Sequence, residues 1–310
     1  MKILVTGANG LLGQRLIQLC LDKKIEVYAT GKGESRLHGL SGVSYKSVDI
    51  TDAGDVKKIL DEVKPDAVVN TAALTHVDDC EKNRELAVDV NVNAVKILAE
   101  ACLERDVYLC HISTDFIFDG EQGMYSEEDE PNPVNFYGET KLMAEEVLHC
   151  YPKLKCSILR TILVFGFVPN LTRTNIILWL NDTLAAGKPV NIVTDQFRTP
   201  TFADDLAAAC LSACELKAEG IYNVGGSEYI SIYDLAQRVA RVFGHDKNLI
   251  TPVQSERFSD KAPRPPKTGF SNAKAREELK YTPHSLNAAL EKLKLQIQDF
   301  NNNEALVLST

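Results

Sequence analysis

The sequence predicts an α/β fold: a doubly wound parallel Rossmann sheet with a smaller C-terminal substrate lobe. Three observations lead to this prediction. Short apolar strand patterns alternate with amphipathic helix patterns through the first half of the chain. A glycine-rich turn follows the first of these strands, and the alternation breaks down near Gly166. Alternating strands and helices indicate a parallel sheet that helices cover on both faces.

Six strands and four helices account for the first half. The expected strands are Lys2–Thr6, Ile25–Thr30, Val43–Val48, Asp66–Asn70, Val107–Ile112 and Ser157–Phe165. The expected helices are the segment from Leu11 to Leu21, then Asp52–Val63, Leu86–Leu103 and Tyr137–Leu148. Pro65 fixes the end of the second helix, because proline cannot continue one. We therefore assign 1–165 to a dinucleotide-binding Rossmann domain.

The second half is more irregular and forms the substrate-binding lobe, 166–310, although we expect 195–228 to return to the first domain. The expected elements are helices Leu171–Ala186, Ala203–Cys214, Ile232–Phe243 and Leu286–Phe300, and strands Val190–Val193 and Ile221–Val224. Asp204 and Ser231 are candidate N-caps. The proline-rich stretch 262–266 is expected to be an extended loop, and 301–310 a polar tail that frays.

Composition excludes several classes of function. The 310 residues are 45% apolar and 25% charged, with a formal net charge of −9. That acidic balance argues against nucleic-acid or anionic-membrane partners, which require basic surfaces. We find neither a signal-peptide pattern at the N-terminus nor an apolar run approaching the ~18 residues of a membrane span. We expect a cytoplasmic protein.

The cysteines and one polar cluster could suggest metal binding. The eight cysteines include no CxxC pair, so we expect reduced packing thiols. The cluster is His76, Asp78, Asp79 and Cys80. Its spacing matches no known metal site, so we interpret it as a loop and expect no bound metal.

The glycine-rich turn is the first functional motif. Gly7, Gly10 and Gly13 lie between the first strand and the first helix. Glycines at such a corner allow a tight turn and a close approach of a pyrophosphate to the helix N-terminus. At the first strand of an alternating α/β pattern, this turn predicts a dinucleotide site.

The residues after the second strand address the choice between NAD and NADP. An NAD site usually places an acid there for the ribose hydroxyls, whereas the 2′-phosphate of NADP needs a cation. No acid occurs before Glu34, and Lys32 is within reach. We therefore favour NADP(H), and NAD(H) remains the alternative. Asp49 and Ile50 follow the third strand, where we expect them to meet the adenine.

A second motif combines a phenol, an amine and a hydroxyl. Tyr137 and Lys141 are four residues apart, on one face of a helix. A nearby ammonium lowers the pKa of a phenol, which makes Tyr137 a candidate general acid for a developing alkoxide. Thr114, at the end of the fifth strand, points into the cofactor crevice. We interpret His111 as a core histidine and assign it no role.

These motifs together resemble the extended short-chain dehydrogenase/reductase superfamily over essentially the whole chain. The residues within these motifs are most similar to those of the dTDP-4-dehydrorhamnose reductase family. The segments that match are TGANGLLG at 6–13, NTAALTHVD at 70–78, STDFIFDG at 113–120, YGETK at 137–141, Arg160-Thr161 and DQFRTPT at 195–201.

The resemblance implies that a hydride passes from a nicotinamide to the C4 ketone of a nucleotide-linked 6-deoxy sugar. Tyr137 would protonate the alkoxide, Lys141 would bind the nicotinamide ribose and tune Tyr137, and Thr114 would hydrogen-bond the carbonyl oxygen. The cofactor contacts that it implies are Gly10, Leu11, Leu12, Ala73, Leu74, Thr75 and Ile112, and the positions near the sugar are Val77, Asp115 and Leu163.

The chain departs from the family pattern in two places, both where substrate is chosen. Ile162-Leu163 replaces an expected tryptophan, and the late Arg-Pro segment is altered at Arg264-Pro265. A homodimer stays open, as does a divalent ion at its interface, for which we see no ligand set.

Two other functions remain alternatives. One is an NAD-dependent nucleotide-sugar epimerase or dehydratase, although Asp115-Phe116 replaces the Asp-Glu pair typical of a dehydratase. The other is a non-catalytic regulatory subunit like that of methionine adenosyltransferase.

Overall fold

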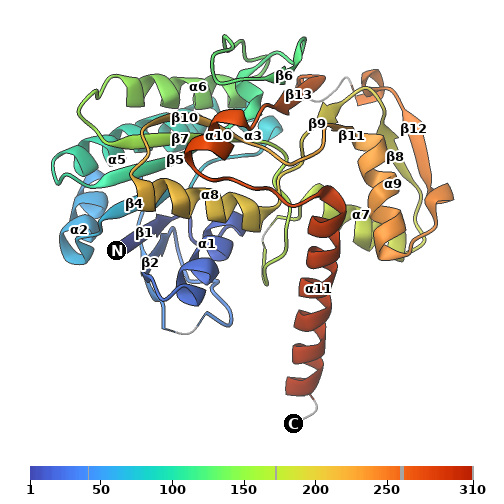
Figure 1. The fold of residues 1–310 in the computed structure, drawn as a ribbon, viewed down its shortest axis with the longest axis horizontal. Coiled ribbons are helices and arrows are strands. Elements are labelled where there is room, and N and C mark those ends of the chain that lie inside the picture. The colour runs from blue at the N-terminus through green and yellow to red at the C-terminus, as the bar shows by residue number, and fades with distance from the viewer. Residues whose placement is uncertain (41, 172, 259–261, 309–310) are drawn as a thin grey trace.

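The computed structural model describes residues 1–40, 42–171, 173–258 and 262–308. Its centre is a seven-stranded sheet in the order β10-β7-β5-β4-β1-β2-β3, in which every pair is parallel (Figure 1). The strands are β1 (Lys2–Thr6), β2 (Glu26–Gly31), β3 (Ser44–Ser47), β4 (Ala67–Asn70), β5 (Tyr108–Thr114), β7 (Cys156–Thr161) and β10 (Gly220–Val224). The predicted doubly wound sheet is confirmed. The strand order reverses between β1 and β4, which opens a crevice at the strands' carboxyl ends.

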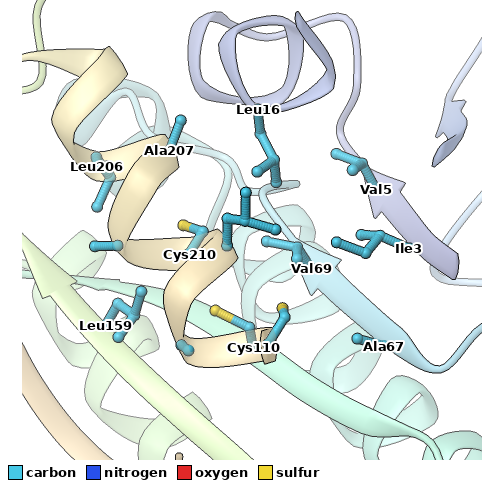
Figure 2. Close-up of a cluster of buried hydrophobic side chains, with 14 of the residues drawn as sticks. Ile3, Val5, Leu16, Ala67, Val69, Cys110, Leu159, Leu206, Ala207 and Cys210 are labelled. Atoms are coloured by element: carbon cyan, nitrogen blue, oxygen red, sulfur yellow. The ribbon is translucent and has the colours of Figure 1, made fainter. Parts of the chain in front are cut away.

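Helices cover both faces of this sheet (Figure 1). One face packs on α1 (Leu11–Asp22) and α8 (Ala203–Leu216), and the other on α2 (Ala53–Val63), α5 (Ala94–Leu103) and α6 (Phe136–His149). Alternate strand residues point to opposite faces, so Val5 and Val69 belong to one core and Leu4 and Val68 to the other. Figure 2 shows the first core, where strand side chains meet Leu16 of α1 and side chains of α8.

The smaller lobe has its own apolar cluster, built by α7 (Ile176–Ala185), α9 (Ile232–Phe243), the start of α11 (Leu286–Leu308), β8 (Val190–Val193) and β12 (Ile250–Val253). A four-stranded sheet in the order β11-β9-β13-β6 contains β11 (Ile230–Ser231), β9 (Phe197–Arg198), β13 (Lys267–Phe270) and β6 (Gly123–Tyr125). The remaining helices are α3 (Val77–Lys82), α4 (Arg84–Val88), α10 (Ala273–Glu278) and the short turns Asp89–Asn93, Asp115–Ile117, Lys247–Leu249 and Ser255–Phe258. None of the helices in the described ranges has both the length and the apolar character that crossing a bilayer requires.

Two late elements lie with the first half of the chain. Strand β10 pairs with β7 at the edge of the large sheet, and α8 packs beside α1. These contacts support the proposal that 195–228 returns to the dinucleotide-binding domain of 1–165. The division from the lobe of 166–310 remains a prediction.

Several predicted helix boundaries are wrong, for local reasons. The helix expected over Leu86–Leu103 is interrupted by the π-helical turn Asp89–Asn93. The helix expected from Leu171 begins at Ile176, because the Asn175 side chain accepts hydrogen bonds from the backbone N–H groups of Ile177 and Leu178. Residue 172, inside that expected range, lies outside the described residues.

One N-cap prediction is wrong and the other is confirmed. Helix α8 is capped by Phe202 without a side-chain hydrogen bond, and Asp204 lies in its first turn, where it pairs with Arg15. The Ser231 hydroxyl does cap α9, accepting from the N–H of Asp234.

The remaining differences concern strand and tail ends. The strand expected to reach Phe165 ends at Thr161. Helix α11 continues to Leu308 through most of the expected polar tail, and 309–310 lie outside the described residues. All eight cysteines are free thiols, as predicted.

Candidate active site

A cavity of about 650 Å³ opens at the carboxyl ends of β1, β4, β5 and β7. It brings together most of the residues that the sequence predicted for the site: Gly10, Leu11, Leu12, Gly13, Ala73, Thr75, Val77, Ile112, Thr114, Asp115, Tyr137, Lys141 and Leu163. Five predicted residues are not among those that line it: Gly7, Lys32, Asp49, Ile50 and Leu74. The residues that line the cavity come from both halves of the chain, from Asn9 to Arg264.

The glycine-rich turn forms one wall, and its shape depends on missing side chains. Gly7 has φ +65°, and a Cβ there would lie 2.6 Å from the backbone nitrogen of Ala72. A Cβ on Gly13 would lie 2.7 Å from the carbonyl oxygen of Gly7. Helix α1 starts after Gly10 without a side-chain cap and without an acid in its first turn. Its N-terminal N–H groups are thus available to an anion such as a pyrophosphate.

The neighbouring segment Ala73–Thr75 is held by one buried amide that the sequence analysis missed. Asn91 accepts from the backbone N–H of Leu74 at 2.8 Å and donates to its carbonyl oxygen at 3.0 Å. A second donor bond, also 3.0 Å long, reaches the Thr140 hydroxyl. Asn91 lies in the π-helical turn of Asp89–Asn93, and such turns are frequent at functional sites. An asparagine inside an apolar helix pattern was the available signal.

The residues expected near the adenosine end are arranged differently from the prediction. Lys32 is 81% exposed, and its Nζ lies 2.7 Å from a carboxylate oxygen of Asp49. The hydrogen bond from Lys32 lowers the pKa of Asp49 to about 2. Arg36 lines the cavity instead, and its backbone N–H donates to the side-chain oxygen of Asn9 at 2.8 Å. Its Nε is buried without a hydrogen-bond partner in the described part of the chain.

The opposite wall holds the candidate catalytic groups. Thr114 ends β5, Tyr137 lies in the first turn of α6, and Lys141 follows one turn later. The Asn135 side chain caps α6 by accepting from the N–H of Gly138 at 2.9 Å. This cap fixes where the helix begins and therefore where Tyr137 faces the crevice.

Burial sets the protonation states of this wall. It raises the pKa of Tyr137, and the hydrogen bond with the Thr114 hydroxyl only partly offsets that effect. Tyr137 is therefore a neutral phenol at physiological pH and has a proton to donate. Burial also lowers the pKa of Lys141 to about 8, against an opposing effect of Glu145. Lys141 is thus close to the point at which its charge changes.

Lys141 has two partners, and one of them is a residue to which the sequence analysis gave no role. Its Nζ donates to the carbonyl oxygen of Ile112 at 2.7 Å and lies 3.0 Å from Nε2 of His111. His111 is 1% exposed and has its nitrogens in contact with partners, as predicted for a core histidine. Nothing in the local strand pattern shows that one of these partners is Lys141.

The residues predicted to lie near the sugar include a buried carboxyl. Asp115 is 3% exposed and accepts a 2.5 Å hydrogen bond from Thr268, while Arg198 lies 3.7 Å away. Burial raises the pKa of Asp115, and Arg198 opposes that shift. The Arg198 guanidinium itself donates to the carbonyl oxygens of Pro265 and Pro266, which ties the altered Arg-Pro segment to the site.

A second cavity of about 300 Å³ adjoins the first and shares Phe116, Leu163, Ile176 and Arg264 with it. Trp179 and Ile192 also line it. Leu163, at the position of the missing tryptophan, thus lies between the two cavities.

The interpretation of His76, Asp78, Asp79 and Cys80 as a loop is wrong, because His76 is the N-cap of α3 and the other three lie in that helix. His76 caps α3 by accepting from the N–H of Asp79, and Asp78 forms a 3.0 Å ion pair with Arg264. Within the described ranges, no group of three or more His, Cys, Asp or Glu side chains could hold a metal ion.

Comparisons with known proteins bear on this arrangement. The model of the RmlD substrate binding domain matches residues 1–298. The chain is 32% identical to the probable low-salt glycan biosynthesis reductase Agl14 of Haloferax volcanii, over 97% of this chain and 100% of the relative. It is 29% identical to methionine adenosyltransferase 2 subunit beta of Xenopus tropicalis, over 82% of this chain and 76% of that protein.

A solved structure has the same fold. The dTDP-4-dehydrorhamnose reductase of Bacillus anthracis, in complex with NADP, superimposes with a TM-score of 0.83 at 26% identity, covering 95% of this chain and 99% of that one. The chain belongs to the RmlD substrate binding domain family, within the extended short-chain dehydrogenase/reductase superfamily of nicotinamide-dependent enzymes.

Proposed function

We propose that this protein uses NADPH to reduce the 4-keto group of a nucleotide-linked 6-deoxy sugar. One observation supports this most: Thr114, Tyr137 and Lys141 line the same cavity as the phosphate-binding turn of Gly10–Gly13. The relatives named as reductases, and the neighbour that holds NADP, support the reaction class and the cofactor.

The proposed mechanism assigns one task to each group. When bound, the nicotinamide supplies the hydride. The Thr114 hydroxyl orients the substrate carbonyl by donating to its oxygen, and Tyr137 gives its proton to the same oxygen as it becomes an alkoxide. Lys141, as an ammonium, stabilises the phenolate left on Tyr137 and holds the nicotinamide ribose.

The direct test is loss of NADPH absorbance when the protein is mixed with dTDP-4-keto-6-deoxy-mannose. We expect oxidation of NADPH that depends on the sugar and yields the 4-hydroxy product. Protein that binds the dinucleotide but oxidises neither NADPH nor NADH with this sugar would contradict the proposed substrate.

The position of Arg36 leads us to propose a different residue for NADP recognition from the one first predicted. Lys32 is neutralised by Asp49, whereas Arg36 lines the cavity with an unpartnered buried Nε in the described structure. A guanidinium can bind the 2′-phosphate through several N–H groups at once. We therefore propose Arg36 as the 2′-phosphate ligand, with NADP(H) preferred over NAD(H).

Replacing Arg36 with methionine tests this proposal. We expect Arg36→Met to raise KM for NADPH about 10- to 100-fold, since hydrogen bonds to charged groups contribute about 1.5–3 kcal/mol. NADH, which lacks the 2′-phosphate, should be used as before. Lys32→Met is the matched control, because exposed ion pairs contribute about 1 kcal/mol or less. A larger effect of Lys32→Met on KM for NADPH would assign the phosphate to Lys32 instead.

The similarity to methionine adenosyltransferase 2 subunit beta supports one second candidate, a regulatory role. A stable complex with a methionine adenosyltransferase catalytic subunit, together with no turnover of keto-sugars, would favour that role. The epimerase or dehydratase alternative has less support, because the solved structures of those enzymes are 21–24% identical and show the fold alone.

A further inference from the structure

A buried series of hydrogen bonds leads from β4 through β5 to Lys141. The donor and the acceptor of each bond in this series can be assigned. Asn70 is 1% exposed, and its side-chain oxygen accepts from the Thr6 hydroxyl at 2.6 Å and from the backbone N–H of Ala72 at 3.3 Å. Its amide nitrogen lies 3.1 Å from Nδ1 of His111. His111 Nε2 in turn lies 3.0 Å from the Nζ of Lys141.

The backbone N–H of Ala72 fixes the orientation of the Asn70 amide. A hydroxyl such as that of Thr6 can donate or accept, but a backbone N–H can only donate. The atom of Asn70 that faces Ala72 must therefore be its oxygen, and the –NH₂ group must point at His111. His111 Nδ1 accepts this bond, so the proton of the neutral imidazole is on Nε2.

This tautomer has a consequence for Lys141. An N–H on Nε2 of His111 points at Nζ of Lys141, which can accept it only as a neutral amine, because an ammonium has no lone pair. As a neutral amine, Lys141 can accept from His111 and still donate to the carbonyl oxygen of Ile112. If Lys141 were an ammonium, its N–H groups and the Nε2–H of His111 would be two donors 3.0 Å apart with no acceptor between them.

Among the other groups around Lys141, one carboxylate opposes this effect, and it also has partners of its own. Tyr137 and Glu145 are on the same helix, and Glu145 is the carboxylate that favours the ammonium form. Glu145 already accepts from Arg160 at 2.7 Å and from Ser113 at 2.5 Å, so its charge is shared. His111 is itself kept neutral, because burial and the neighbouring lysine both lower its pKa.

We infer that Asn70 and His111 are positioning residues that make the ammonium form of Lys141, the form that acts in the proposed reaction, easier to deprotonate. The hydrogen bonds from the Ala72 N–H to Asn70 and from Asn70 to His111 set the tautomer of His111. This tautomer disfavours the ammonium form of Lys141. Asn70 lines the cavity and His111 does not, and we assign both an action through Lys141 and not on the reacting atoms. The inference about the tautomer is independent of the proposed function, and only its effect on the pH profile rests on that function.

Asn70→Asp tests which atom donates in the hydrogen bond between residue 70 and His111, with a side chain of the same shape. A carboxylate at 70 offers only acceptors, so the proton of His111 should move to Nδ1, and Nε2 should then accept from an ammonium on Lys141. The ¹⁵N chemical shifts of histidine distinguish a protonated from an unprotonated ring nitrogen. We expect Nε2–H in the parent protein and Nδ1–H in Asn70→Asp.

His284 provides an internal reference in the same spectra, since its Nδ1 lies 2.5 Å from a carboxylate oxygen of Asp205 and should carry a proton in both proteins. His111→Gln identifies the His111 signals by their loss. A parent protein with His111 protonated on Nδ1, or an Asn70→Asp protein with unchanged His111 signals, would overturn the inference whatever reaction the enzyme performs.

The pH profile of kcat measures the effect on Lys141. We expect activity to fall as pH rises through about 8, where Lys141 loses its proton. In Asn70→Asp this basic limb should move up by about one pH unit, a tenfold change in the fraction of neutral amine. His111→Gln removes the imidazole donor without adding a charge and should move it in the same direction. A shift in Asn70→Asp alone would show an effect of the added charge, and unchanged limbs in both variants would show a merely structural role.

Discussion

Tyr137→Phe is expected to lower kcat for keto-sugar reduction by about 10²- to 10⁴-fold, the usual contribution of a positioned general acid. Burial raises the pKa of Tyr137, so the parent side chain is a neutral phenol whose proton is available for transfer. Phenylalanine keeps the ring and its edge-to-face contact with Phe116, whose centroid is 5.9 Å away, but has no proton to give. The loss should therefore appear in kcat, with the dissociation constant of NADPH close to that of the parent protein.

Tyr151→Phe is the matched control. Tyr151 follows the end of the same helix, and its hydroxyl donates to Glu100 at 2.8 Å, on the face of the sheet that packs on α5 and α6. This variant removes a phenolic hydroxyl and should keep normal turnover. Near-normal kcat in Tyr137→Phe would exclude Tyr137 as the acid.

Gly138→Ala is expected to have the second-largest effect, through the backbone. A Cβ at Gly138 would collide with the carbonyl oxygen of Phe116, a rigid backbone atom beside the end of β5. Overpacking of this kind costs about 1–3 kcal/mol or more, because α6 must shift away from the Asp115–Ile117 turn. That shift would separate Tyr137 from Thr114. We expect a melting temperature on the order of 2–5 °C lower and a loss of turnover at temperatures where the variant is still folded.

Gly54→Ala is the corresponding control. Gly54 lies in the first turn of α2, and a Cβ there meets only the Asp52 side chain, at 3.0 Å. Alanine also has the higher helix propensity, so this variant should be close to the parent in stability and activity. Thermal unfolding followed by circular dichroism, with kcat measured in parallel, compares the two substitutions. Equal stability of the two variants would show that the Phe116 segment yields without cost.

The predicted site residues fall into two groups according to how they were found. Local patterns were sufficient for the glycine turn and for Tyr137 and Lys141, because both depend on spacing within a single segment. Spacing also predicted that Thr114 would face them, since the carboxyl ends of neighbouring parallel strands meet at the same edge. These residues all line one cavity in the structure.

Other residues have partners that the local patterns did not show. Lys32 was chosen for its charge and its place after β2; it pairs with Asp49, which follows another strand, while Arg36 lies at the cavity, so a role of Lys32 in NADP binding stays a prediction. Asp204 has the chemistry of an N-cap, but its carboxylate pairs with Arg15 of α1. In both cases the charged side chain forms an ion pair with a residue that is distant in the sequence, and a local pattern cannot show such a partner.

Local sequence patterns were enough to predict the alternating architecture, the glycine-rich turn and the pair of Tyr137 and Lys141. Each of these follows from the period of apolar residues or from the conformational freedom of glycine, and both are local properties. The pairing of charged groups, and the ring nitrogen of His111 that lies next to Lys141, could be known only from the folded structure. The His111 contact, for example, depends on the distances between Asn70, His111 and Lys141, which lie on three different elements. It also depends on the burial of these side chains, which strengthens the hydrogen bonds between them.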